Sequence, residues 1–169
     1  MRLHIEHSRY DTPLGPVLIA ATQRGIASLR FVERSVLDAR RGEPPHGVRD
    51  ALVAYFDGDL SALDALKLDI TGTPFQRRVW GAVRDIEAGR TASYAEIARA
   101  IGARPGAARA VGAANGANPV LLIVPCHRVV GAAGALTGYA AGIERKRSLL
   151  EHEGALGPRT LDLFGASEP

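Results

Sequence analysis

The hydrophobic pattern of this 169-residue chain changes near Ile70, and the change limits the folds open to it. Before it, short apolar segments at 2–7, 17–21 and 26–31 are separated by turn residues, as in an antiparallel meander. Residues 48–56 then space their apolar positions like a helix, and residues 66–70 alternate like one more strand. Residues 1–70 are therefore predicted to form a small α/β domain with an antiparallel sheet.

After Ile70 the pattern becomes helical, and local signals mark where each helix begins. Thr73-Pro74 predicts a cap and a first-turn proline for a helix over 75–86, and Ser93 and Glu96 form a capping box for the next. A third helix is predicted over 106–115. The last two outline a helix-turn-helix, although helical hairpins are common. Residues 71–169 are predicted to form a second domain, with a tail from about residue 157.

Length and composition limit the kinds of protein that this chain can be. A chain of this length can bury a core without metal or disulfides, as one domain or as two small ones. Cys126 is the only cysteine, which excludes an internal disulfide, a CxxC pair and a multi-cysteine zinc site. The start of the chain lacks an apolar signal region, and no apolar run is long enough to span a bilayer. We therefore expect a soluble cytoplasmic protein that does not contact membranes.

Basic side chains are concentrated in the second part of the chain. Residues 77–147 contain 11 Lys and Arg against four Asp and Glu, although the net charge of the whole chain is only +3. A basic surface of this kind attracts a phosphate backbone. On charge alone, a solvated basic face is the commoner explanation.

The apolar run at 121–124 is predicted to be a buried strand that ends at Pro125, because proline has no amide hydrogen for the ladder. Cys126 and His127 would then lie where a rigid strand gives way to a loop, a common place for functional side chains. Taken alone, a free cysteine is more often a small buried apolar residue than a nucleophile.

A nucleophilic Cys126 would need a base, because only a few per cent of an unperturbed thiol is ionised at neutral pH. His127 is the nearest candidate, but neighbouring side chains of an extended chain point to opposite faces, so we expect a water bridge rather than direct contact. A carboxylate would fix the tautomer of the histidine. Glu151 and Glu153, at the end of a helix that begins near Gly142, are both candidates. A cysteine hydrolase would use the same three residue types.

Several ordered segments carry a resemblance to a known family. The most specific is 118–129, Asn-Pro-Val-Leu-Leu-Ile-Val-Pro-Cys-His-Arg-Val. Shorter matches flank it: Pro74-Phe75-Gln76-Arg77-Arg78-Val79-Trp80, Ser93-Tyr94, Ala108-Arg109-Ala110-Val111-Gly112, Gly138-Tyr139, Lys146 and His152-Glu153-Gly154. With these, residues 71–169 resemble the O6-alkylguanine-DNA alkyltransferases, also called methylated-DNA–protein-cysteine methyltransferases. The N-terminal half matches this family in general layout only, and we expect it to act as structural support.

The resemblance implies an α+β fold, in which a small α/β domain with a ribonuclease H-like antiparallel sheet precedes a mostly helical, winged helix-turn-helix-like domain. It implies a DNA-repair enzyme that acts as a monomer on double-stranded DNA, turns O6-alkylguanine out of the duplex through the minor groove and transfers the alkyl group irreversibly to its own cysteine. O4-alkylthymine is left open as a second substrate. The product would be a thioether, formed once per molecule. No metal or organic cofactor is expected.

The resemblance also implies roles for individual residues. Cys126 would be the alkyl acceptor, His127 the base acting through water, and Glu153 the acid behind it. Asn118 would brace the active-site turn, and Tyr94 would rotate the DNA backbone and help to protonate the leaving guanine. The remaining implied residues are the intercalating Arg109 with DNA contacts at Ala108, Gly112 and Arg128, and a base pocket formed at Val129, Tyr139 and Ala140.

The chain departs from this family in two places, and three rival functions stay open. The family often has a larger or hydroxyl-bearing residue after Gly138-Tyr139, whereas this chain has Ala140-Ala141, which predicts a roomier pocket. The extra metal-binding module of some members is not expected here, which argues against a transcription activator. An alkyltransferase-like protein that binds lesions without repair is disfavoured by Cys126. The two remaining rivals are a helix-turn-helix regulator and a cysteine hydrolase.

Overall fold

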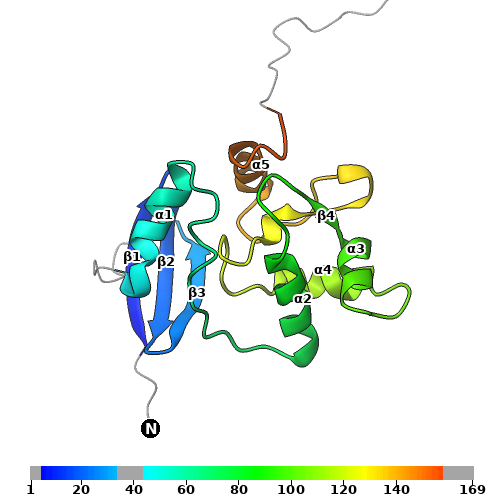
Figure 1. The fold of residues 1–169 in the computed structure, drawn as a ribbon, viewed down its shortest axis with the longest axis horizontal. Coiled ribbons are helices and arrows are strands. Elements are labelled where there is room, and N and C mark those ends of the chain that lie inside the picture. The colour runs from blue at the N-terminus through cyan, green and yellow to red at the C-terminus, as the bar shows by residue number, and fades with distance from the viewer. Residues whose placement is uncertain (1–4, 34–43, 158–169) are drawn as a thin grey trace, which may run out of the picture.

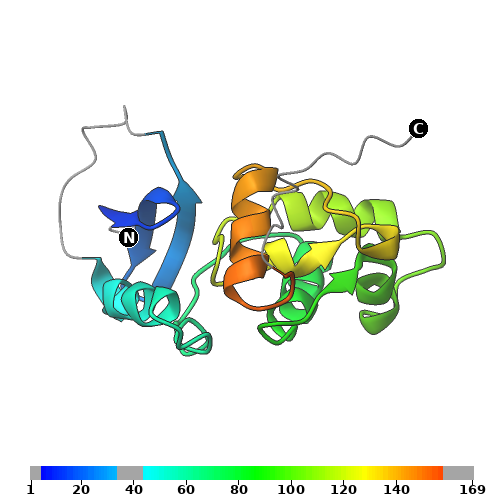
Figure 2. The same cartoon turned by 90° about the horizontal axis from the view of Figure 1, so that it is seen from above.

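The structure is a computed structural model that describes residues 5–33 and 44–157. Its first lobe contains three strands and a helix (Figures 1 and 2). Strands β1 (Glu6–Thr12), β2 (Gly15–Thr22) and β3 (Gly25–Phe31) pair antiparallel in the order β1-β2-β3, and α1 (Val48–Phe56) lies against one face of the sheet. The predicted meander is confirmed. Its first strand was expected over 2–7. Residues 2–4 of that range lie outside the described residues, and the strand that the structure describes is Glu6–Thr12.

Alternation along β2 determines how this lobe packs. Val17, Ile19 and Ala21 are at most 1% exposed, and they share one core with Val48 and Leu52 of α1. Burying such side chains contributes about 1.5–3 kcal/mol each for the larger ones. The helix predicted over 48–56 is confirmed to the residue.

The strand predicted over 66–70 is wrong. Only Leu68 forms a bridge, parallel to Ile26, through two backbone bonds: Ile26 N donates to Lys67 O at 2.9 Å and Asp69 N donates to Ile26 O at 2.8 Å. The apolar alternation arises because Leu66 is buried and Leu68 is partly buried, without a strand between them. The chain leaves the sheet after this one bridge to begin the second lobe.

Within the described residues, four α-helices and a two-stranded sheet form the second lobe (Figure 1). The helices are α2 (Pro74–Arg84), α3 (Tyr94–Ala100), α4 (Ala108–Gly116) and α5 (Ile143–His152), and the parallel strands are β4 (Ala92–Ser93) and β5 (Val129–Val130). Thr73 and Gln76 form a capping box at α2, and Ser93 and Glu96 form the predicted one at α3. The predicted helices are confirmed, with ends that differ by one or two residues.

Helices α2 and α4 pack together around one aromatic side chain. Trp80 of α2 is 3% exposed, and its indole N–H donates to Ala114 O of α4 at 2.8 Å. Val79, Val83 and Val111 are fully buried beside it. This packing fixes α4 relative to α2 and therefore fixes the floor of the cavity described below.

The buried strand predicted over 121–124 is also wrong, because the segment is a buried turn. Leu122 has a φ of 71°, and Val124 N donates to Val120 O at 3.0 Å. The Asn118 amide closes the turn by donating to Val124 O at 2.8 Å and accepting from Val120 N at 3.0 Å. A continuous apolar run is equally compatible with any fully buried backbone, so its composition does not reveal the turn.

The same turn ties the two lobes together. Leu29 N of β3 donates to Pro119 O, and Leu121 N donates to Leu29 O, both at 2.9 Å. Buried apolar side chains from both lobes accordingly form one continuous core. The mixed α+β architecture predicted from the sequence is confirmed. Among the helices of residues 5–33 and 44–157, none is long and apolar enough to cross a membrane.

Candidate active site

Cys126 begins a 3₁₀ helix, Cys126–Arg128, directly after the buried turn. It is therefore not at the end of a strand, as the sequence pattern predicted. The side chain is 3% exposed and lies on the wall of a cavity of about 260 Å³. The other residues around this cavity come from α3, α4 and the loop before α5: Tyr94, Gly112, Asn115, Gly116, Gly138, Tyr139 and Ala140.

The thiol of Cys126 is protonated at neutral pH. Burial raises its pKa to about 11, although the Asn118 side chain and the charge of Lys146 pull the pKa down. At neutral pH only about one molecule in ten thousand would carry a free thiolate. A reaction at this sulfur therefore needs a base that takes the proton as the sulfur attacks.

His127 supplies a neutral imidazole beside the thiol. Its side chain is fully buried, and its Nε2 lies 2.9 Å from Oε1 of Glu153. Burial lowers the pKa of His127, although Glu153 acts in the opposite direction. Because the carboxylate accepts the Nε2 proton, Nδ1 carries the lone pair, and Nδ1 has no hydrogen-bond partner within the described part of the chain.

Glu153 follows α5 and accepts hydrogen bonds from three residues of two other elements, α1 and the 3₁₀ helix Cys126–Arg128. Oε1 accepts from His127, from Nη2 of Arg128 at 2.8 Å and from the Tyr55 hydroxyl at 2.6 Å, while Oε2 accepts from Nε of Arg128 at 2.8 Å. Burial opposes ionisation, but the bonds from His127, Arg128 and Tyr55 outweigh it and lower the pKa of Glu153 to about 2. Of the two carboxylates left open by the sequence, Glu153 faces His127. Glu151 lies 4.0 Å from Arg147 instead.

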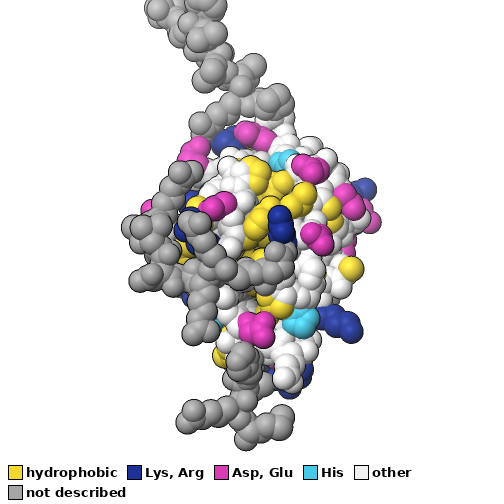
Figure 3. All heavy atoms as spheres, turned by 90° about the vertical axis from the view of Figure 1, so that its left-hand side faces the viewer, with side chains coloured by type: hydrophobic (Ala, Val, Ile, Leu, Met, Phe, Trp, Pro, Cys, Tyr) yellow, Lys and Arg dark blue, Asp and Glu magenta, His cyan; other side chains and the backbone are white. Residues whose placement is uncertain are grey.

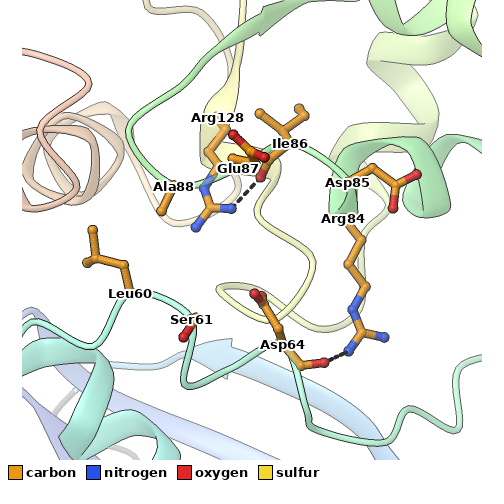
Figure 4. A pocket seen from close by; sticks show the side chains of 9 residues that line it. All are labelled: Leu60, Ser61, Asp64, Arg84, Asp85, Ile86, Glu87, Ala88 and Arg128. Carbon is orange, nitrogen blue, oxygen red and sulfur yellow. Dashed lines mark hydrogen bonds between the residues drawn. The ribbon is translucent and has the colours of Figure 1, made fainter.

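Arg128, which the resemblance implied as a DNA contact, is almost fully buried and pairs with Glu153. The residue is 5% exposed, and besides its two bonds to Glu153 it donates through Nη1 to Ile86 O at 2.5 Å. It borders a second cavity of about 460 Å³ between residues 60–64 and 84–88 (Figure 4). There Arg84 donates to Asp64 O at 2.7 Å and joins the two lobes. The sequence position of Arg128 gave no sign of the buried carboxylate that it pairs with.

Lys146 and Tyr55 contact the site, but neither was assigned to it from the sequence. Lys146 of α5 is fully buried and donates to Val129 O at 2.5 Å and Thr137 O at 2.7 Å. Burial lowers its pKa to about 8, although Cys126 acts in the opposite direction. Helical spacing could have predicted that Lys146 is buried near Glu153, since residues 146, 149, 150 and 153 share one buried face of the chain around α5.

Tyr94 of α3 packs against α4 at Gly112. A Cβ on Gly112 would lie 3.6 Å from the Tyr94 ring, and one on Gly138 would lie 3.9 Å from the Tyr94 hydroxyl. Tyr94 thus spans from α4 to the loop before α5. Arg109 is exposed, Ala108 is half-buried beside it, and neither lines the cavity.

The predicted base pocket is only partly assembled. Tyr139 and Ala140 line the cavity, and the Tyr139 ring lies edge-on to His127 with ring centroids 6.3 Å apart. The hydroxyl of Tyr139 is buried and has no partner in the parts that the structure describes. Val129 does not line the cavity, because its N–H donates to Cys126 O and its carbonyl accepts from Lys146.

Comparison with known protein families yields two matches that cover most of the chain. The profile described as "6-O-methylguanine DNA methyltransferase, ribonuclease-like domain" matches residues 5–70. The profile described as "6-O-methylguanine DNA methyltransferase, DNA binding domain" matches residues 74–155. A methylated-DNA–protein-cysteine methyltransferase of Mycobacterium tuberculosis is 49% identical over 165 residues, which is 95% of this chain and 99% of that protein. One from Salmonella typhimurium is 56% identical over 112 residues, 66% of this chain and 65% of that protein.

Solved structures show the same similarity. A crystal structure of Mycobacterium tuberculosis OGT in complex with DNA has a TM-score of 0.77 at 48% identity and covers 89% of this chain and 93% of that one. The O6-methylguanine-DNA methyltransferase of the hyperthermophilic archaeon Pyrococcus kodakaraensis has a TM-score of 0.60 at 26% identity, over 89% of this chain and 99% of that one.

Proposed function

Because this chain belongs to the 6-O-methylguanine DNA methyltransferase family, we propose that it repairs DNA by moving an alkyl group from O6 of guanine to Cys126. The observation that carries the proposal is the arrangement around the sulfur. A buried, protonated thiol borders a cavity, and the next residue, a neutral His127 whose Nδ1 has no hydrogen-bond partner among the described residues, is held by ionised Glu153.

The proposed reaction begins with removal of the thiol proton. The Cys126 proton passes to Nδ1 of His127, whose growing charge is stabilised by Glu153. Neighbouring side chains in a 3₁₀ helix diverge by about 120°, so a bridging water remains our expectation for this transfer. The sulfur then forms a bond to the alkyl carbon as the bond from carbon to O6 breaks. Guanine leaves with the electron pair and takes a proton, for which Tyr94 is the proposed donor.

Access to the cavity requires the alkylated base to leave the DNA stack, at a cost of a few kcal/mol. We propose that exposed Arg109 fills the vacated space and that Ala108 and Gly112 let α4 approach the minor groove. The basic stretch 77–147 lies within the second lobe, whereas the outer face of the first lobe mixes acidic, basic and apolar side chains (Figure 3). The second lobe is therefore the proposed DNA-binding surface, on a protein that acts as a monomer.

Cys126 would react only once. Its product is a thioether, which has no easy hydrolysis, and the chain contains no second cysteine that could exchange with it. The proposed reaction needs no cofactor, because the alkylated base is itself the electrophile.

The pocket is proposed to accept alkyl groups larger than methyl. Ala140 and Gly116 border both the Cys126 cavity and a neighbouring one of about 270 Å³, which Ala141 also lines. An Ala141→Trp variant should lose transfer from O6-benzylguanine DNA selectively and retain transfer from O6-methylguanine DNA. If both reactions were lost to the same extent, or if neither were lost, the proposed pocket would be contradicted.

Intact mass spectrometry tests the function. After incubation with excess O6-methylguanine duplex, each molecule should replace one S–H by S–CH3, and Cys126→Ala should gain nothing. Turnover without an adduct would instead support a cysteine hydrolase. Sequence-selective DNA binding without an adduct would support a regulator.

A further inference from the structure

Tyr55 belongs to α1 of the first lobe, yet its hydroxyl lies in the network behind Cys126. It is 1% exposed and donates to Oε1 of Glu153 at 2.6 Å, across 98 positions of sequence. Its carbonyl accepts from Nε2 of His152 at 2.9 Å, and its ring packs edge-on against the same histidine with centroids 5.1 Å apart. Three contacts therefore fix Tyr55 at the end of α5.

The partner of this hydroxyl distinguishes Tyr55 from an ordinary core tyrosine. A phenylalanine would fill the same volume, and a structural hydroxyl could be satisfied by any backbone carbonyl. Here the hydroxyl bonds the same carboxylate oxygen that accepts the Nε2 proton of His127. Burial and the Glu153 charge both raise the pKa of Tyr55, so it remains a donor throughout the working pH range.

We propose that Tyr55 is a positioning residue through which the first lobe sets the basicity of His127, by sharing Oε1 of Glu153 with it. The inference rests on the proposed function, in which His127 takes the thiol proton. It makes the first lobe part of the reaction rather than a support for it.

The charge on Oε1 of Glu153 determines how loss of the Tyr55 hydroxyl would change the basicity of His127. The hydroxyl proton neutralises part of the charge on Oε1, so its removal would leave more negative charge facing Nε2 and make His127 hold a proton more tightly. The other polar groups around His127 are Arg128 in its own helix, Lys146 of α5 and Tyr139. None of these is altered by a change from tyrosine to phenylalanine at position 55.

The test is Tyr55→Phe, with Tyr10→Phe as the matched control. Tyr10 is a partly buried tyrosine of β1 that packs on the core of the same lobe. Single-turnover methyl transfer would be measured against pH, and the His127 ring would be titrated by NMR. Tyr55→Phe should raise the pKa of His127 and move the acid limb of the rate profile up by about one pH unit. Tyr10→Phe should match the native protein.

Further results would distinguish a positioning role of Tyr55 from a packing role. A rate reduced equally at all pH values, with an unchanged His127 titration, would overturn the proposal and leave Tyr55 a packing residue. If Tyr55→Phe does not fold, site-specific 3-fluorotyrosine at position 55 replaces it. Its more acidic phenol should donate more strongly and move the limb to lower pH, and an unmoved limb would overturn the proposal. A native protein that forms no methyl adduct would refute the proposed function, while the NMR titration would still test the effect of Tyr55 on His127.

Discussion

Glu153 is the residue on which the charges of the site converge. It is 4% exposed, and its two oxygens accept four hydrogen bonds from His127, Arg128 and Tyr55. A buried carboxylate is stable only with such partners, because desolvation of an unpaired charge costs several kcal/mol. Under the proposed function, the residue serves both stability and chemistry. Spacing alone left Glu151 and Glu153 open and the resemblance implied Glu153, which is the carboxylate that meets His127 in the folded chain.

Glu153→Gln should make the stability of the protein less dependent on pH. The pKa of Glu153 is about 2 in the folded state and near 4.3 in an unfolded chain, so its contribution is complete above the unfolded value and is lost as pH falls toward 2. At neutral pH the variant should lose on the order of 3 kcal/mol in free energy of unfolding. Urea titrations should show this deficit shrinking from about pH 4.5 downward, and a constant deficit would contradict the assigned ionisation.

At the scale of elements, the helices were predictable because their signals are local. Thr73 and Gln76, or Ser93 and Glu96, mark a helix start within four residues. The segment at 121–124 was not predictable, since its turn is held by the side chain of Asn118 and by bridges to β3. The strand at 66–70 failed for a related reason, because its pairing ends after a single bridge to Ile26.

Two glycines at and before α2 should respond in opposite ways to alanine. A Cβ on Gly72 would lie 2.5 Å from the ring of buried Trp80, whereas a Cβ on Gly81 would meet nothing within 4 Å. Gly72→Ala should therefore cost about 1–3 kcal/mol through overpacking, and Gly81→Ala should add about 0.5–1 kcal/mol through helix propensity. Thermal unfolding measures both. Emission from Trp80, the only tryptophan, should change only in Gly72→Ala, and equal effects of the two substitutions would contradict the packing described.

The whole molecule has one core, and its active site draws on both lobes. Tyr55 from α1 and the bridge between Leu29 and Val120 connect the first lobe to the segment that carries Cys126. The sequence predicted the α+β architecture and the Cys126 segment, but it treated the first 70 residues as support. Contacts between positions far apart in sequence, such as Tyr55 with Glu153 or Lys146 with Val129, have no local signature. The domain boundary near residue 70 remains a prediction.

Arg109→Ala should impair repair of duplex DNA and spare the chemistry. Arg109 is exposed on α4 and lines no part of the Cys126 cavity. Transfer from an O6-methylguanine duplex should slow roughly 10- to 100-fold, since the variant no longer offsets the cost of turning the base out. Reaction with free O6-benzylguanine base should be unchanged. Arg104→Ala, which removes an exposed charge in the preceding turn, should weaken DNA binding only slightly. An equal effect of the two variants would contradict the proposed intercalation and would mean that Arg109 contributes only its charge.

The central claim is that Cys126 accepts the alkyl group and leaves repaired guanine behind. The most direct measurement incubates the protein with a duplex that contains one O6-methylguanine, then maps the peptides by tandem mass spectrometry and digests the DNA to nucleosides. We expect one methyl group on the sulfur of Cys126 for each guanine restored, and none in Cys126→Ala. A methyl group on another residue, or restored guanine without any protein adduct, would contradict this claim.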